Sequence, residues 1–162
     1  MSAFVGPTLG YRDARAAIRF LVTAFGFEEV AVYEGEKGTV DHAELRWPGG
    51  GGVMVHTAES GGNSVADLSA KAAADGGFPA FSVHVSTNDP DALFKRAITT
   101  GASVVREVVD SPFGTRGFIV RDPEGLYWSF GTTLPKLVRG ADGQWHPPTR
   151  AGKKAREKGP DR

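Results

Sequence analysis

Hydrophobic and polar positions along the chain first predict two amphipathic helices. One runs from an N-cap at Asp13 to a stop at Gly26. The other starts from Asp89 or Asp91 and stops at Gly101. The apolar stripe of the first is Ala14, Ala17, Ile18, Leu21, Val22 and Phe25, and that of the second is Ala92, Leu93, Ala97 and Ile98.

Each predicted helix is preceded by one strand-like run and followed by three. Asp122-Pro-Glu-Gly125, a type I turn sequence, joins the last two runs into a hairpin. The unit βαβββ therefore occurs twice, about 75 residues apart. The runs are Pro7–Tyr11, Glu28–Tyr33, Val40–Trp47 and Gly52–Thr57, then Phe81–Ser86, Ser103–Val109, Thr115–Arg121 and Leu126–Phe130.

Two such units predict an α+β fold. We expect two curved mixed sheets around a central cleft, with the helices on the outer faces. A single domain is expected over residues 1–134, with module one at about 4–58 and module two at about 79–133. A short helical turn is expected near Val65–Ala74, in the segment between the modules.

Composition narrows the class of protein. The chain has 162 residues, a net charge of zero and no cysteine, which excludes disulfides, thiol nucleophiles and Cys-ligated metals. Neutrality gives no case for nucleic acid or an anionic membrane. No apolar stretch reaches the roughly 18 residues of a spanning helix, and the N-terminus lacks a signal-peptide pattern. We expect a cytoplasmic protein.

Residues 135–162 form a Gly-, Pro- and Lys/Arg-rich tail with little periodicity. A solvated terminus is the favoured interpretation of its basic cluster, and nucleic-acid contact is the alternative. Trp145 is the exception in this segment, because a Trp in such a context often docks onto its own domain or a partner subunit.

Alternation in two strands predicts which side chains face the cleft. Ser82 and His84 share one face of their strand, and Tyr127 and Ser129 share one face of the last strand. We expect these polar faces to line the cleft. The opposite faces are expected to be core and carry Val83, Val85, Trp128 and Phe130.

Three stretches, in order and suitably separated, carry a resemblance to a known family. They are DARAAIRFLVTAFGF at 13–27, DALFKRAITTGA at 91–102 and RDPEGLYWSFG at 121–131. Together they resemble the vicinal-oxygen-chelate superfamily, which includes glyoxalase I, bleomycin-resistance proteins, fosfomycin-resistance enzymes and extradiol dioxygenases. The resemblance covers about residues 4–133. It implies homodimers, with pockets at or near the subunit interface.

The resemblance also implies where a catalytic metal would bind. Metal ligands in that superfamily, usually His and Glu, sit on the first and last strands of the two modules. Those positions correspond here to Gly6, Ser82 and Ser129, with a fourth near Met54 to His56. Glycine has no side chain, and a neutral serine hydroxyl is a poor ligand for a divalent metal. We therefore expect no metal and no other cofactor.

Three histidines leave a metal alternative open. His42, His56 and His84 stand on three different strands, and three histidines would suit zinc. Their spacing carries no local motif, and no carboxylate is evidently paired with them. The favoured interpretation is that they are polar lining for an organic ligand.

Aromatic residues predict the character of the cleft walls. Walls of this kind bind flat organic molecules by stacking and burial. Arg116 is a candidate for meeting an anionic group of the ligand, and a solvated strand end is the alternative. The aromatic residues at positions that can border the cleft are Tyr33, Trp47, Phe113, Phe118 and Tyr127.

The favoured function is a metal-independent protein of the bleomycin-resistance type. It would sequester or carry a planar, aromatic compound, an antibiotic among the candidates, and act as a homodimer. The alternative is a metal-dependent lyase or dioxygenase-like enzyme that uses a displaced histidine site. A vestigial cleft on an interaction module is the weakest of the three.

Overall fold

The computed structural model describes residues 6–58, 82–112, 114–133, 138–139, 141 and 143–146. Phe113 and the expected turn at Val65–Ala74 lie outside these residues. Within them, no helix is long and apolar enough to cross a membrane.

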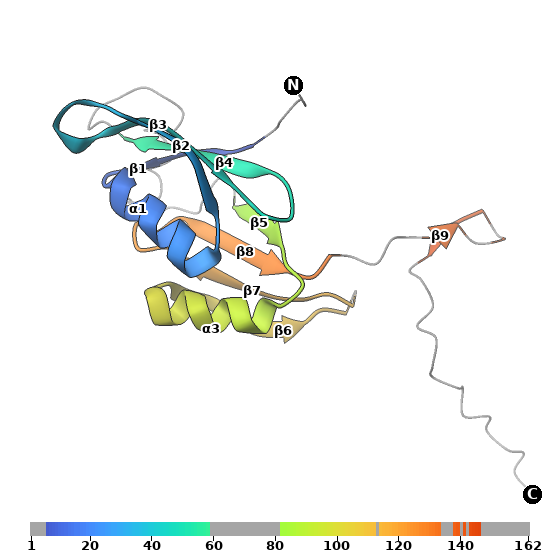
Figure 1. The fold of residues 1–162 in the computed structure, drawn as a ribbon. Helices are drawn as coiled ribbons and strands as arrows, with labels where there is room; N and C mark the ends of the chain where they lie inside the picture. The colour runs from blue at the N-terminus through green and yellow to red at the C-terminus, as the bar shows by residue number, and fades with distance from the viewer. Residues whose placement is uncertain are drawn as a thin grey trace, which may run out of the picture.

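Two four-stranded mixed sheets repeat one topology (Figure 1). The N-terminal sheet has the order β1-β4-β3-β2, and the C-terminal sheet has the order β5-β8-β7-β6. In each, the first strand is parallel to the last, and the other pairs are antiparallel. The strands are β1 (Thr8–Tyr11), β2 (Glu28–Glu34), β3 (Val40–Arg46), β4 (Gly52–Thr57), β5 (Val83–Ser86), β6 (Ser103–Asp110), β7 (Arg116–Arg121) and β8 (Tyr127–Gly131). The predicted βαβββ repeat is confirmed.

Each module carries one main helix between its first two strands. These are α1 (Ala14–Phe20), extended by the π-helical segment η1 (Leu21–Phe25), and α3 (Pro90–Thr100). A one-turn 3₁₀ helix, η2 (Glu36–Gly38), links β2 to β3.

Asp caps and Gly stops set the ends of both helices. The Asp13 carboxylate accepts from the Ala16 N–H at 2.9 Å, and Asp89 accepts from the Ala92 N–H at 3.0 Å. Asp89, not Asp91, is therefore the second N-cap. Both stops are glycines in the left-handed region, with φ of 95° at Gly26 and 116° at Gly101, which glycine adopts without a steric penalty.

The first helix is one residue longer than the second and absorbs the excess as a π turn. The number of sequence positions from the Asp N-cap to the Gly stop is 13 in the first helix (26 − 13) and 12 in the second (101 − 89). At the end of η1 the Gly26 N–H reaches both the Leu21 and Val22 carbonyls at 3.1 Å. A wide last turn of this kind is typical of a π-bulge.

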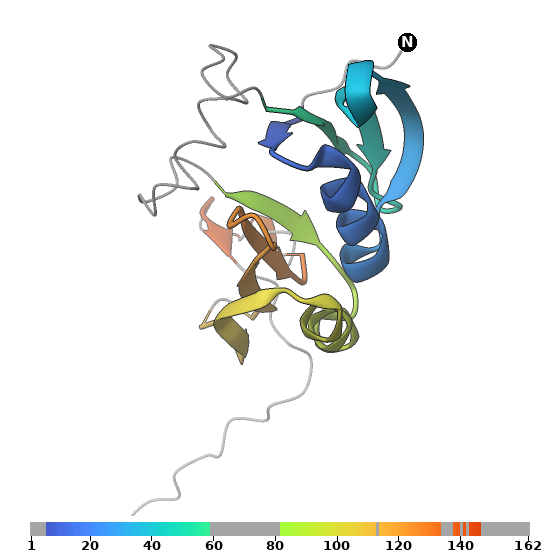
Figure 2. The same ribbon diagram turned by 90° about the vertical axis from the view of Figure 1, so that its left-hand side faces the viewer.

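The modules share one hydrophobic core through their helix-facing sides (Figure 2). The Phe25 ring of η1 lies 5.1 Å from the Trp128 ring and 4.7 Å from the Phe130 ring, centroid to centroid. From α3, the Arg96 guanidinium donates to the Ala24 and Phe25 carbonyls at 2.9 and 2.7 Å. The end of the first helix therefore joins the two modules.

The opposite faces of both sheets remain open. Tyr33 on β2 is 63% exposed, and His84 on β5 is exposed. The paired modules are as expected, but the described part of this chain does not close a cleft between facing sheets. The helix-covered faces are the ones that meet, since the aromatic side chains of η1 pack on the C-terminal sheet.

The segment expected as a tail contains a short hairpin. Strand β9 (Val138–Arg139) pairs antiparallel with β10 (Trp145–His146). The Trp145 side chain lies outside the described part, so its expected docking stays a prediction.

Candidate functional site

The open face of the C-terminal sheet carries the predicted pair of polar residues. His84 on β5 lies beside Ser129 on β8, and their Nδ1 and Oγ atoms are 3.0 Å apart. Trp128 and Phe130 are fully buried on the opposite face. Alternation therefore assigned both faces of β8 correctly, and Ser129 has a hydrogen-bond partner on the neighbouring strand.

A hollow of about 350 Å³ lies where the two modules meet. Trp47 and His84, which come from different modules, both line it. The Trp47 indole N–H donates to the Ser86 carbonyl at 3.1 Å, and its ring packs 5.3 Å from the Phe27 ring. The other lining residues are Pro7, Phe27, Gly49, Gly50, Gly51, Gly52, Val53, Val83, Val85 and Ser86.

The run of glycines at positions 49–52 lines this hollow, and Gly49 lies close to the Trp47 indole. A Cβ at Gly49 would lie 3.0 Å from the Trp47 ring nitrogen, and Gly50 and Gly51 adopt φ of 106° and 80°. A larger residue at Gly49 would crowd the ring, while Gly50 and Gly51 use a backbone conformation that suits glycine. The run shapes the hollow, and no helix follows it to bind phosphate.

Tyr127 shares the open face of β8 with Ser129. Arg121, its partner across the β7–β8 ladder, holds its guanidinium carbon 5.7 Å from the centre of the Tyr127 ring. This distance suits a cation–π contact. Sequence reasoning singled out Tyr127 but missed Arg121, because only the ladder register brings the two side chains together.

Arg116 is occupied by carboxylates of its own chain. Its Nε and Nη2 donate to the two Asp91 oxygens at 2.7 and 2.8 Å, and Nη1 lies 3.3 Å from Asp110. The bidentate hydrogen bonds lower the pKa of Asp91 and raise that of Arg116. The guanidinium proposed to meet a ligand anion is thus already neutralised within this chain.

The three candidate histidines are divided between the two sheets. His42 on β3 and His56 on β4 belong to the N-terminal sheet, and His84 belongs to the C-terminal sheet. The His42 Nε2 lies 3.4 Å from the Glu44 carboxylate. Over the described residues, no group of three His, Cys, Asp or Glu side chains is placed to hold a metal ion. The alternative His42–His56–His84 triad is therefore not assembled within this part of the chain.

Phe118 corrects an expectation about the cleft walls. It is fully buried, and its ring stacks on the Phe130 ring with 5.1 Å between centroids. Successive side chains of β7 alternate between the two faces of the sheet. Phe118 pairs with Phe130 on the core face, and Ile119 pairs with Ser129 on the open face.

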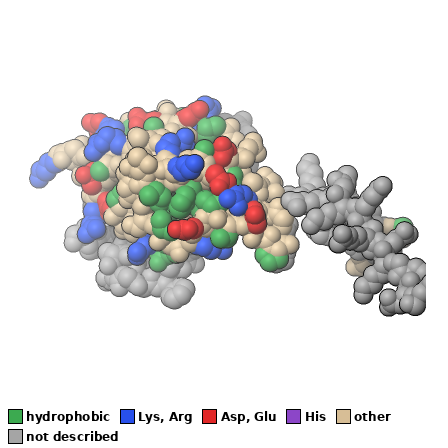
Figure 3. Space-filling view, turned by 90° about the horizontal axis from the view of Figure 1, so that it is seen from below, with side chains coloured by type: hydrophobic (Ala, Val, Ile, Leu, Met, Phe, Trp, Pro, Cys, Tyr) green, Lys and Arg blue, Asp and Glu red, His purple; other side chains and the backbone are tan. Residues whose placement is uncertain are grey.

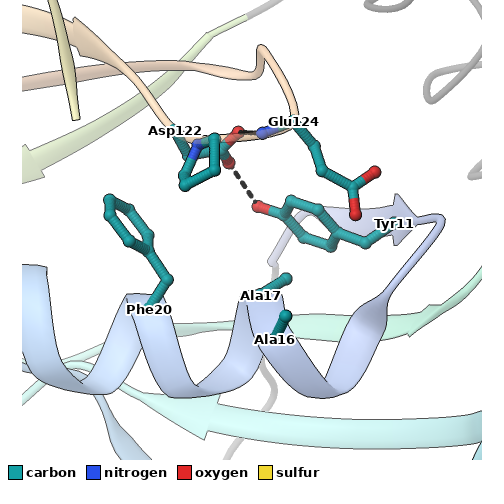
Figure 4. Close-up of a pocket in the computed structure, with 7 residues that line it drawn as sticks. Tyr11, Ala16, Ala17, Phe20, Asp122 and Glu124 are labelled. Carbon is teal, nitrogen blue, oxygen red and sulfur yellow. Dashed lines mark hydrogen bonds between the residues drawn. The ribbon is translucent and has the colours of Figure 1, made fainter. Parts of the chain in front are cut away.

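A buried node that sequence reasoning missed joins β1 to the β7–β8 turn (Figure 4). Asp122 is 3% exposed, and its carboxylate accepts from the Tyr11 hydroxyl at 2.7 Å and the Trp128 indole N–H at 3.0 Å. The backbone N–H groups of Glu124 and Leu126 donate to its other oxygen. Burial raises the pKa of Asp122, and these four donors act in the opposite direction. Burial also raises the pKa of Tyr11, so its hydroxyl stays protonated.

Comparison with known proteins decides the family. A model described as the Glyoxalase/Bleomycin resistance protein/Dioxygenase superfamily matches residues 5–130. The chain belongs to this superfamily. An uncharacterized protein of Mycobacterium tuberculosis is 37% identical to this superfamily member over 136 residues, which make up 82% of this chain and 76% of that protein.

Solved structures of the superfamily share the fold. TioX from Micromonospora sp. ML1 is 33% identical with a TM-score of 0.62, over 82% of this chain and 100% of that chain. The fosfomycin resistance protein FosX from Listeria monocytogenes, solved with Mn(II) and sulfate, is 12% identical with a TM-score of 0.53, over 82% and 93%. At that identity FosX supports the fold alone.

Three of the four positions at which the superfamily resemblance places metal ligands hold a weak donor or none in this member, and His56 is the one imidazole near the fourth. Gly6 offers no side chain, Ser82 is exposed, and Ser129 is hydrogen-bonded to His84. A metal held by carboxylate or imidazole ligands does not fit these residues, because a neutral hydroxyl is a poor donor to a divalent ion.

Proposed function

We propose that this superfamily member is a metal-independent binding protein that sequesters or carries a planar, aromatic small molecule. The observation that carries the proposal is the hollow that Trp47 and His84 line together from separate modules. Its volume of about 350 Å³ lies within the range of small-molecule pockets, roughly 300–1,000 Å³. Antibiotics are among the candidate ligands, since the family description includes bleomycin resistance.

The chemistry of the lining supports a flat ligand. Trp47 and Phe27 supply aromatic surface, and Val53, Val83 and Val85 supply aliphatic surface. An aromatic contact contributes roughly 0.5–1.5 kcal/mol beyond the burial of area. The weak donors at Gly6, Ser82 and Ser129 support binding without a metal, and hence binding in preference to metal-dependent lyase or dioxygenase chemistry.

Binding of a neutral planar probe tests the proposal. We expect naphthalene-2-carboxamide to bind in equilibrium dialysis with a Kd between about 1 mM and 1 μM, equivalent to about 4 to 8 kcal/mol. Trp47→Ala should weaken binding about tenfold, because one stacking contact and its buried surface are lost. Dialysis against EDTA should leave the affinity unchanged.

Phe94→Ala is the matched control. Phe94 packs on Phe118 at 5.1 Å and does not line the hollow, so its loss should lower stability without changing affinity. Binding that survives Trp47→Ala unchanged would contradict the assignment of the hollow. Binding abolished by EDTA and restored by zinc or manganese would contradict metal independence.

We also propose that the protein is a homodimer in which the exposed edge strands β2 and β6 are covered. The equivalent edge strands β2 and β6 both expose large apolar side chains: Val30 and Tyr33 on β2, and Val104, Val105 and Val109 on β6, at 44–63% exposure. Figure 3, viewed from the side of α3 and β6, shows hydrophobic side chains gathered among charged ones. Uncovered edges and apolar side chains favour association with another copy.

Light scattering at micromolar concentration is expected to give twice the chain mass of 17.2 kDa. Tyr33→Lys should shift the equilibrium toward monomer, because it places a charge on an edge strand. Lys37→Ala, a change in the η2 turn, serves as the control. A monomer at every accessible concentration would contradict the homodimer and show that the exposed edge strands do not pair with a second copy.

A further inference from the structure

The two arginines at opposite ends of β7 differ in the groups that their guanidinium groups contact. Arg116 is engaged by Asp91 and Asp110. Arg121 forms no ion pair with any residue that the structure describes, and its guanidinium lies over the Tyr127 ring. A guanidinium stacked on an aromatic face keeps its N–H donors directed outward, where they can bind a carboxylate in bidentate fashion.

The His84–Ser129 pair supplies a second polar element on the same face. Ser129 holds the Nδ1 atom of His84, and Nε2 has no hydrogen-bond partner among the described residues. A serine hydroxyl both donates and accepts, so it suits either tautomer of the imidazole and also the imidazolium. His84 can therefore present an Nε2–H donor to a ligand without losing its anchor.

The ladder places these two elements on either side of β8. Tyr127 and Ser129 are alternate residues of β8, with Arg121 beside the first on β7 and His84 beside the second on β5. Strands β7 and β5 are two spacings apart, about 10 Å, and the two residues are also offset by two positions along the strands. Arg121 and His84 therefore stand roughly 12 Å apart across the face, a separation that a bicyclic aromatic acid lying between the two side chains can span. His84 also lines the hollow, so the hollow and this face adjoin.

We propose that this face binds the anionic group of the ligand, which makes the ligand a planar aromatic acid. Arg121 supplies the positive charge that meets this group, and His84, anchored by Ser129, contacts the end of the ligand that lies toward the hollow. The inference rests on the proposed binding function and adds the chemical class of the ligand.

A pair of probes of equal shape tests the charge. Naphthalene-2-carboxylate and naphthalene-2-carboxamide are titrated into the full-length protein near neutral pH at low salt. We expect the carboxylate to bind at least about tenfold more tightly than the amide, with the preference falling as salt is added. In Arg121→Gln the ratio should fall to near one.

Arg116→Gln is the matched control and should keep the carboxylate preference, because that guanidinium is occupied within the chain. Arg121→Lys keeps the charge without the planar fork and should retain part of the preference, so it tests the inference even if Arg121→Gln is unstable. Ser129→Ala, which releases the imidazole, should weaken both probes by a similar factor and leave the preference in place, because His84 contacts the end of the ligand away from the charge.

Equal affinity for the two probes, or a preference that persists in Arg121→Gln, would overturn the inference and leave the binding function standing. Failure of both probes to bind would instead contradict the proposed function, and the inference with it. A preference lost in Arg116→Gln but kept in Arg121→Gln would assign the anion to Arg116 and overturn the choice of Arg121.

Discussion

Replacing Phe25 by alanine is expected to lower the free energy of unfolding by about 3–5 kcal/mol. Phe25 is fully buried, and its ring packs on Trp128 and Phe130 of the other module. Its loss removes apolar burial and leaves a cavity at the point where the modules meet. Thermal unfolding of the variant should remain one transition at a midpoint lower by about 10 °C.

Val22→Ala is the control for Phe25, because Val22 lies in the same π-helical segment and is 37% exposed. Its effect should stay below about 1 kcal/mol. If Phe25→Ala instead produces two separate transitions, the modules do not depend on their shared core. A loss below about 1 kcal/mol would show that other contacts hold them together.

The second large effect is expected at Asp122. Asp122→Asn should cost about 3 kcal/mol, because an amide of the same shape has one acceptor oxygen for four donors. Its NH₂ group must face either two backbone N–H groups or the Trp128 indole N–H. Denaturant titration measures the loss, which should appear as a lower midpoint with an unchanged slope.

Tyr11→Phe separates the contributions at this node. It removes one donor and leaves the carboxylate three, so the expected cost is about 1 kcal/mol. Asp41→Asn, on the exposed side of β3, is the matched control and should lie within about 0.5 kcal/mol of the parent chain. An Asp122→Asn variant as stable as the parent would show that the node is not needed to hold β1 to the β7–β8 turn.

Local patterns were sufficient for most of the secondary structure. Asp and Gly residues marked both helices, and alternation assigned the two faces of β8, because these signals act within a few residues. The strand Gly52–Thr57 has the predicted bounds, and the others differ by one or two residues at their ends.

Contacts between distant residues were not predictable in the same way. Tyr11 and Asp122 are 111 positions apart, and nothing local distinguishes this aspartate from any other that begins a turn. The Arg116 and Arg121 side chains look equivalent in the sequence, and only the positions of Asp91 and Tyr127 tell them apart. Phe118 was wrongly predicted to border the cleft, because the register of β7 with β8 decides which of its side chains face the core.

The wide last turn at Leu21–Phe25 has a consequence for the history of the chain. The repeated topology points to duplication of an ancestral βαβββ unit, and the helices of the two copies differ by one residue between cap and stop. An insertion inside a helix rotates everything after it by about 100°, unless one turn widens to absorb it. A gain in one copy, or a loss in the other, would leave this one-residue difference, and the π turn accommodates it. The wide turn ends with Phe25, the residue whose ring contacts the other module, so a change of helix length is accommodated at the point where the two halves meet.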